Sequence, residues 1–439
     1  MAKIKNAILQ QLWANRSGRI AIIVLLALGS LALFAPVLAN SLPYYVFFQG
    51  KVYFPFFQPN LKINLQQAQD QALFKTTLKD VNWYDQKLEK AYWAPVPYSP
   101  SYNDYPNRLR GPFDQQIRVG EGNTKTPLSW RFRHWLGTEN GGKDILAILI
   151  HGGRVSLLIG LVGMGLAGII GLLLGSMAGY FGNDRFETRK GFLVGIVIFL
   201  IPMWFYGYYV RRYLIESAFE ASLMYGLLQS LISILIVLTL GGLGWMLGIW
   251  LQKWSWAQVS VKLPIDLLIM RLMELLKSIP LIIILIWVIH QTEHQFWLSA
   301  LVIGLFSWVS TARLVRGDMM HVAHMPYIEV ARLQGFSDWY IMIKHAIPNA
   351  LTSFWIILAF GVGNVIMAEA ALVFLGLDTD ATMISWGELL SSRGADIVDK
   401  WWIVVFPGFT IFFVVLACNI LGEKIRDLLD TKMLEQRNQ

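Results

Sequence analysis

The sequence predicts an all-α, polytopic membrane protein. Of its 439 residues 55% are hydrophobic and only 15% are charged, whereas soluble domains carry about 25% charged residues. Several uncharged runs reach the roughly 20 residues that a helix needs to cross a bilayer. The runs do not alternate between polar and apolar residues, which argues against a transmembrane β-barrel. Helices are the expected form because they satisfy their own backbone hydrogen bonds in lipid.

Composition also limits the chemistry. The net charge of +8 reflects membrane topology rather than a nucleic-acid partner, because Lys and Arg lie mainly at the ends of the apolar runs. The single cysteine, Cys418, excludes an intrachain disulfide and a cysteine metal cluster. No phosphate loop of the Gly-x-x-x-x-Gly-Lys-Ser/Thr type occurs, so the chain is not expected to hydrolyse ATP. We assign no catalytic, cofactor-binding or metal-binding residue.

The N-terminal part divides into two predicted segments. Residues 1–40 are expected to be a polar N-terminus and a first transmembrane helix, which contains the apolar run Ile20–Leu38. A cleaved signal peptide is the alternative, but the run exceeds the usual 7–15 residues and its basic lead-in is long. Residues 41–148 are polar and rich in aromatic residues and proline, and they predict an extramembrane domain or ordered loop.

The next two segments are apolar again. Residues 149–183 are expected to be a core transmembrane helix, because glycines recur at three- and four-residue spacing in the run Val155–Phe181. This spacing allows close helix–helix approach in membranes. Residues 184–263 carry two further runs, Gly191–Val210 and Ala221–Gln252. Arg211 and Arg212 then fall on the outer side, against the positive-inside tendency, so a re-entrant 191–210 segment is the alternative.

Residues 264–423 complete the predicted transmembrane part. They contain an amphipathic stretch and four apolar runs, one that begins at Ser278 and three at Phe296–Ala312, Ala346–Ala368 and Trp401–Gly422. The total is eight spans, which places both termini on one side. The basic N-terminus and the charged tail, residues 424–439, indicate that this side is the cytoplasm.

The polar segment between the apolar runs Phe296–Ala312 and Ala346–Ala368 is the most informative. Tyr327–Gln334 can form a two-turn helix, and Gly335 can take a positive φ and end it sharply. Ser337 is a candidate N-cap for a second helix, which Pro348 is expected to break before the next span. A short helix held between two bends is suited to docking in the groove of a partner.

This segment resembles the cytoplasmic coupling loop of ABC-importer permeases, in which Glu-Ala-Ala, three residues and Gly are followed by an Ile-x-Leu-Pro ending. Here Val330 replaces the first Ala, His345 the Ile and Ile347 the Leu. Residues 135–183 and 264–431 resemble the dipeptide/oligopeptide (and nickel) branch of that family, second-permease type. Residues 39–95 are similar to a subgroup with an enlarged periplasmic region, which takes up oligopeptides and microcin C-type compounds.

The resemblance implies an ABC type I importer transmembrane domain in the bacterial inner membrane. It would have six core helices, the two extra predicted spans and a periplasmic insertion after the first helix. ATP and Mg would be bound by partner ATPase subunits and not by this chain. A second homologous permease and a periplasmic or lipoprotein substrate-binding protein would complete the importer. Peptides are the family's usual cargo, although nickel chelates and sugars use similar permeases.

The resemblance also implies site residues. The coupling loop, residues 313–348, would contact the ATPase through Tyr327, Glu329, Val330, Ala331, Leu333, Gly335, Phe336, Ile347 and Pro348. Candidates for the translocation pathway are Glu369, an ionisable residue near the outer end of a span, with Ser385 and Trp386. For Glu369, a hydrogen bond between helices is the alternative role.

Two other function classes stay open at this point. A secondary transporter would require charged or broken-helix sites near the membrane midplane, and the runs lack them. A membrane haem or metal enzyme is suggested by the helical spacing of His321 with His324 and of His290 with His294. No carboxylate or cysteine set surrounds these pairs, so we interpret them as interfacial histidines.

Overall fold

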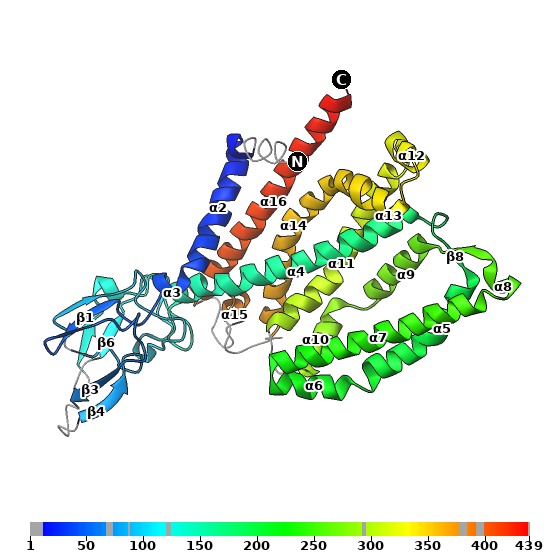
Figure 1. The fold of residues 1–439 in the computed structure, drawn as a ribbon. Coiled ribbons are helices and arrows are strands. Elements are labelled where there is room, and N and C mark those ends of the chain that lie inside the picture. The colour runs from blue at the N-terminus through cyan, green and yellow to red at the C-terminus, as the bar shows by residue number, and fades with distance from the viewer. Residues whose placement is uncertain are drawn as a thin grey trace.

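The computed structural model describes residues 12–66, 73–86, 88–119, 124–291, 296–376, 384–391 and 399–437. Figure 1 shows a helical bundle with a small β-rich region at one end. The helices are α2 (Arg16–Leu33), α3 (Ala35–Leu38), α4 (Ile145–Phe181), α5 (Lys190–Trp204), α6 (Arg212–Ala221), α7 (Leu223–Leu251), α8 (Ser255–Gln258), α9 (Ile265–Ser278), α10 (Leu281–Gln291), α11 (Phe296–Val322), α12 (Pro326–Leu333), α13 (Asp338–Ile341), α14 (Ile347–Phe374), α15 (Trp386–Leu390) and α16 (Trp402–Arg437). The start of α2 and the end of α16 lie toward the same end of the bundle as α12.

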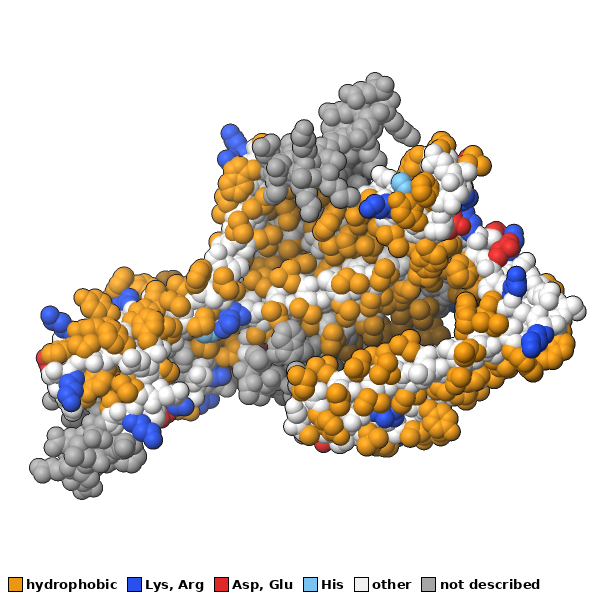
Figure 2. Space-filling view, in the orientation of Figure 1, with side chains coloured by type: hydrophobic (Ala, Val, Ile, Leu, Met, Phe, Trp, Pro, Cys, Tyr) orange, Lys and Arg blue, Asp and Glu red, His pale blue; other side chains and the backbone are white. Residues whose placement is uncertain are grey.

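Seven helical segments among the described residues are long and apolar enough to cross a membrane. They correspond to seven of the eight predicted runs. The run that begins at Ser278 corresponds to α10, of which the structure describes 11 residues. Residues 292–295, which include His294, lie outside the described residues. Figure 2 shows hydrophobic side chains over most of the visible face of the bundle.

The extramembrane region between α3 and α4 has a small core of its own. Its strands are β1 (Tyr45–Phe48), β2 (Lys51–Tyr53), β3 (Lys62–Gln66), β4 (Leu73–Thr77), β5 (Lys90–Tyr92), β6 (Ile117–Val119) and β7 (Lys125–Pro127). They form an antiparallel β2–β1–β5 sheet and two hairpins, β3–β4 and β6–β7. Gln49 and Gly50 join β1 to β2, and both have positive φ, as two-residue hairpins of type I′ require. Val46 of β1 is buried in one hydrophobic cluster with Leu78 and Trp83.

A buried histidine joins this region to the bundle. The His134 side chain is fully buried, and its two ring nitrogens lie 2.8 Å from Asp144 Oδ2 and 3.1 Å from Asp104 Oδ2. Asp144 also caps α4, because its Oδ1 accepts a hydrogen bond from the backbone N–H of Ala147. This cap explains why α4 begins at Ile145 rather than within the more apolar stretch that follows. Burial alone would lower the pKa of His134, but the hydrogen bonds to Asp104 and Asp144 raise the pKa to about 9.

The stability of the extramembrane region is therefore expected to fall at alkaline pH. The pKa of His134 rises on folding from about 6.5 to about 9, so its stabilising contribution is complete below pH 6.5 and is lost as the pH rises through 9. The whole effect amounts to about 3 kcal/mol. Limited proteolysis of residues 41–134 should be slower at pH 6.5 than at pH 9.5. In His134→Gln this difference should disappear; an unchanged pH dependence in that variant would contradict the assignment.

The insertion 184–263 leaves and re-enters the core at one place. Strand β8 (Glu187–Arg189) pairs antiparallel with β9 (Ser260–Lys262), in the register Thr188 opposite Val261. Between the two strands, α5 and α6, joined by a π-helical turn at Phe205–Tyr209, pack along α7. The hairpin of α5, α6 and α7 packs on itself, on α8 and on the β8–β9 ribbon. Among the described residues, no core helix packs extensively on this hairpin. The two extra predicted spans therefore form a hairpin of their own, and Figure 1 shows it beside the bundle.

The arginine that conflicted with the topology prediction is accommodated inside this hairpin. Arg211 Nε donates to Ser233 Oγ at 2.8 Å, and the same guanidinium reaches the Gln229 side-chain oxygen, both on α7. Residues 190–221 are long and apolar enough to count as one candidate span, which contains a π-helical turn. The re-entrant alternative for residues 191–210 stays a prediction. The predicted outer loop at Arg211 is thus replaced by a longer helix that continues to Ala221.

Helix α4 is the central helix of the bundle, as its glycine pattern predicts. A Cβ atom at Gly171, Gly175 or Gly179 would lie 2.6 Å or less from Thr311, Ala312 or Arg316 of α11. The two backbones therefore touch along several turns, which only glycine permits. Helix α4 also packs against α2, α9 and α14. Its lipid-facing side keeps large apolar residues, such as Leu161 and Ile169, exposed.

Candidate functional site

The segment after α11 forms the rigid helix that the sequence predicts. Helix α12 covers Pro326–Leu333, with Pro326 in its first turn and Glu329 close behind. Gly335 has φ +84° and ends the helix. Ser337 caps α13 by accepting a hydrogen bond from the N–H of Tyr340 at 3.4 Å. These predictions about local structure are confirmed.

The predicted break at Pro348 is not seen. Helix α13 continues through a π-helical turn, Met342–Ala346, directly into α14, which begins at Ile347. Pro348 lies in the first turn of α14, where its missing N–H costs little. The local widening at Met342–Ala346 replaces the break.

The two faces of α12 differ in what they contact. Ile328 and Ala331 are buried against the ends of α4 and α11. The opposite face is exposed and mostly apolar: Leu333 is 88% exposed and Val330 53% exposed. The exposed apolar patch consists of Tyr327, Val330, Leu333 and Phe336. Exposed apolar groups gathered on a surface that also carries charges are typical of a protein interface.

A polar clasp joins this loop to the end of α4. Tyr180 OH, on α4, donates to Asp338 Oδ1 at 3.0 Å, and the Arg332 guanidinium lies 3.3 Å from the same oxygen. The three residues come from α4, α12 and α13. Nearby, Arg185 donates to the backbone oxygens of Tyr180 and Ala323 at 2.8 and 3.2 Å. Helix α12 is therefore fixed to α4 as well as to α11, and a force on α12 would act on both helices.

A second ion pair fixes α9 to α11 near the same end. The Arg316 guanidinium faces both carboxylate oxygens of Asp266, with Nη2 2.6 Å from Oδ2. Asp266 is 8% exposed, and its backbone N–H donates to Gly182 O. A bidentate pair of this kind fixes orientation as well as distance.

The sequence analysis did not single out the residues of the clasp or of this ion pair. Four of the residues that were not singled out, Tyr180, Asp338, Asp266 and Arg316, lie within residues 135–183 and 264–431, which carry the family resemblance. In the sequence, these residues are marked only as polar side chains near the end of an apolar run. That signal becomes specific only when the fold shows which ends meet.

Glu369, Ser385 and Trp386 come together at the other end of α4. Ser156 Oγ lies 3.3 Å from Glu369 Oε2 and accepts the backbone N–H of Trp386 at 3.2 Å. Glu369, Ser385 and Trp386 are 2%, 4% and 1% exposed. The structure therefore brings the three candidates together in a buried contact among α4, α14 and α15. Their role in translocation stays a prediction.

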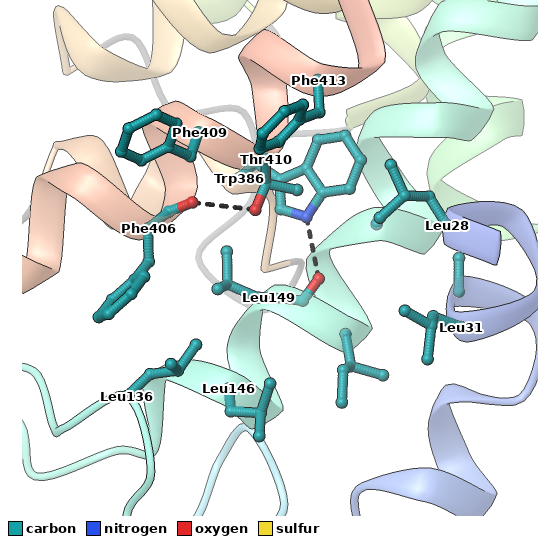
Figure 3. Close-up of a pocket in the computed structure, with 13 residues that line it drawn as sticks. Leu28, Leu31, Leu136, Leu146, Leu149, Trp386, Phe406, Phe409, Thr410 and Phe413 are labelled. Carbon is teal, nitrogen blue, oxygen red and sulfur yellow. Dashed lines mark hydrogen bonds between the residues drawn. The ribbon is translucent and has the colours of Figure 1, made fainter. Parts of the chain in front are cut away.

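Trp386 borders an apolar cavity of about 280 Å³ among α2, α4 and α16. Figure 3 shows its indole N–H donating to Leu149 O, 2.9 Å away, with Leu28 and Phe413 beside the ring. The only polar side chains along this wall are the indole and Thr410, which bonds to Phe406 O of its own helix. Among the described residues no charged group lines this cavity, so it does not suit a polar ligand.

Comparison with known proteins gives a family match for the helices just described. Residues 243–435 match the model of the "binding-protein-dependent transport system inner membrane component". Within residues 243–435 the chain is therefore similar to the permeases of that family. The matched range contains α9 to α14, and with them the α12 loop and its clasp partners Arg332 and Asp338.

The relatives of the permease extend the match toward its N-terminus. It is 27% identical over 346 residues to the glutathione transport system permease protein GsiD of Pectobacterium atrosepticum, covering 78% of this chain and 82% of the relative. It is 25% identical over 299 residues to the oligopeptide transport system permease protein OppC of Haemophilus influenzae, covering 68% and 70%. A putative peptide transport system permease protein of Brucella suis is 36% identical over 170 residues, covering 38% and 57%.

The family match and the named relatives together indicate the general role of the chain. Permeases of this family are multi-pass proteins of the inner membrane, and they work with ATPase and substrate-binding partners. The seven candidate spans agree with that location. The permease is thus a transport subunit, and the secondary-transporter and metal-enzyme alternatives are not favoured.

Proposed function

We propose that this permease imports peptides or peptide-like compounds and that α12 receives the movement of an ATPase subunit. The relatives named for oligopeptide and glutathione transport support this cargo class. The observation that carries the coupling role is the exposed apolar patch on α12, since its other face is fixed to α4 and α11. The patch lies in a cleft of the ATPase, and closure of the ATPase moves α12, α4 and α11 together.

The named coupling residues divide by function in this proposal. Tyr327, Val330, Leu333 and Phe336 provide the contact surface, and Glu329 faces the ATPase or stabilises the first turn of α12. Ala331 packs α12 on the bundle, Gly335 provides the turn, and Ile347 and Pro348 start the next span. The partner subunits bind ATP and Mg, and this chain binds neither. The termini and α12 are cytoplasmic, a second homologous permease completes the pathway, and a periplasmic or lipoprotein binding protein delivers the cargo.

Replacement of Gly335 tests the geometry of the turn. Its φ of +84° disfavours side chains, although no atom lies within 4 Å of a Cβ placed there. Gly335→Val therefore introduces backbone strain of about 1–2 kcal/mol without a clash, whereas Gly335→Asn is tolerated because Asn adopts this conformation. We expect Val to lower binding-protein-stimulated ATPase activity about 5- to 30-fold and Asn to preserve most of it. Equal activity in both variants would exclude a role for the turn, and failure of the wild type to co-purify with an ATPase would exclude the function.

A further inference from the structure

Two adjoining cavities lie along one face of α11. The first, of about 260 Å³, is enclosed by α4, α10, α11 and α14. The second, of about 470 Å³, lies between the end of α9 and the half of α11 nearer to α12. Ser310 lines both cavities, so they form one continuous groove that leads toward the end of the bundle that carries α12.

The groove contains polar side chains at a depth where lipid-facing positions are apolar. Ser307, Ser310, Thr311 and Asn364 line the first cavity, and we call these four residues the polar strip. Ser307, Ser310 and Leu314 are spaced by three and four residues on α11 and therefore share one face of the helix. Asn364 lies in the middle of the candidate span Ser353–Phe374.

Two groups in the polar strip lack partners. The Thr311 side chain is fully buried, and its Oγ1 has no hydrogen-bond partner in the part of the chain that the structure describes. Asn364 is exposed, and its amide makes no hydrogen bond to another described residue. An unpaired amide or hydroxyl in hydrocarbon costs several kcal/mol. Because Asn364 is exposed on this face, the face does not contact acyl chains there and requires water or a polar molecule opposite it.

The second cavity continues the polar surface with charges. Lys277, Arg313 and Asp318 line it together with Gly317. Asp318 Oδ2 is buried and has no hydrogen-bond partner among the described residues. Charged side chains within a span mark ion or substrate paths more often than they mark lipid contacts. The groove thus changes from hydroxyl and amide groups in the middle of the bundle to charged groups near α12.

We propose that the polar strip and the Lys277–Arg313–Asp318 mouth line the water-filled path along which cargo crosses this permease. The inference rests on the proposed import function and identifies its path on this chain. Ser, Thr and Asn side chains both donate and accept hydrogen bonds, so they suit the N–H and C=O groups of a peptide backbone of any sequence. Ile303, Ile357 and Phe360 in the same cavity offer apolar surface to its side chains.

Cysteine accessibility tests this path without knowledge of the cargo. Cys418 is the only cysteine of the chain, so Cys418→Ala gives a cysteine-free background. Ser310→Cys and Asn364→Cys are then introduced singly, with Leu305→Cys as the matched control, because Leu305 lies exposed on α11 outside both cavities. The probe is a charged, membrane-impermeant methanethiosulfonate, applied to the assembled complex in proteoliposomes.

We expect the two strip cysteines to react at least tenfold faster than Leu305→Cys, at rates that change when the ATPase is trapped with ATP and vanadate. Rates equal to that of Leu305→Cys, in a complex that retains ATPase activity, would overturn the path and leave the proposed function intact. Fast reaction in a permease that binds no ATPase would overturn the import role itself. Asn364→Leu gives a second measurement. We expect it to lower binding-protein-stimulated ATPase activity about fivefold, and unchanged activity would also contradict the path.

Discussion

Leu333→Glu is expected to prevent stable assembly of the permease with its ATPase. Leu333 is 88% exposed on α12, so the substitution leaves the packing of the bundle unchanged. Burial of a leucine in a partner's groove contributes about 2 kcal/mol, and a carboxylate in its place has to be desolvated as well. We therefore expect the affinity for the ATPase to fall at least about 30-fold. Co-purification and surface-based binding measurements would report this loss.

A matched control separates this effect from a general response to surface charge. Phe113 is 86% exposed in the extramembrane region, at the opposite end of α4 from α12. Phe113→Glu makes the same chemical change and should leave ATPase binding unaltered. Equal binding by Leu333→Glu and the wild type would show that the exposed face of α12 is not the docking surface.

Gly179→Val is expected to destabilise the bundle more than any single surface change. A Cβ at Gly179 would lie 2.4 Å from the backbone oxygen of Arg316 and 2.6 Å from Met319 Cβ. Backbone atoms cannot move aside as a flexible side chain can, so α4 and α11 have to separate. Overpacking of this kind costs about 3 kcal/mol. The thermal unfolding midpoint of the purified permease in detergent should fall clearly.

Gly165 on the same helix provides the control for this prediction. No atom lies within 4 Å of a Cβ placed at Gly165, so Gly165→Val changes helix propensity by a similar amount without a clash. Its unfolding midpoint should stay near that of the wild type. If both variants unfolded at the same temperature, the close approach of α4 and α11 would not contribute to stability.

The parts of the fold that local chemistry determines were predictable from sequence. Gly335 and Ser337 mark the end of one helix and the start of the next, because a positive φ and an N-cap depend on the residue itself. The glycine spacing in α4 predicted a buried helix, since small residues at this spacing let the backbone of another helix approach closely. The resemblance to binding-protein-dependent permeases, carried by the α12 loop, is confirmed by the family match.

Features that depend on tertiary contacts were not predictable. The burial of Glu369 against Ser156 joins residues 213 positions apart, and no local pattern indicates it. Arg211 contradicted the charge rule for loops because that rule does not account for polar partners on α7. The polar strip was missed because single Ser, Thr and Asn residues within apolar runs carry no periodic signal. Assignment to the subgroup with an enlarged periplasmic region stays a prediction.

The β8–β9 ribbon has a consequence for how this chain acquired its extra helices. Because Glu187 and Lys262 sit opposite each other, the 72 residues between Thr188 and Val261 depart from and return to neighbouring points, so a lineage can gain or discard them without displacing a core helix. Contacts such as that of Arg211 with Ser233 hold this module together from within.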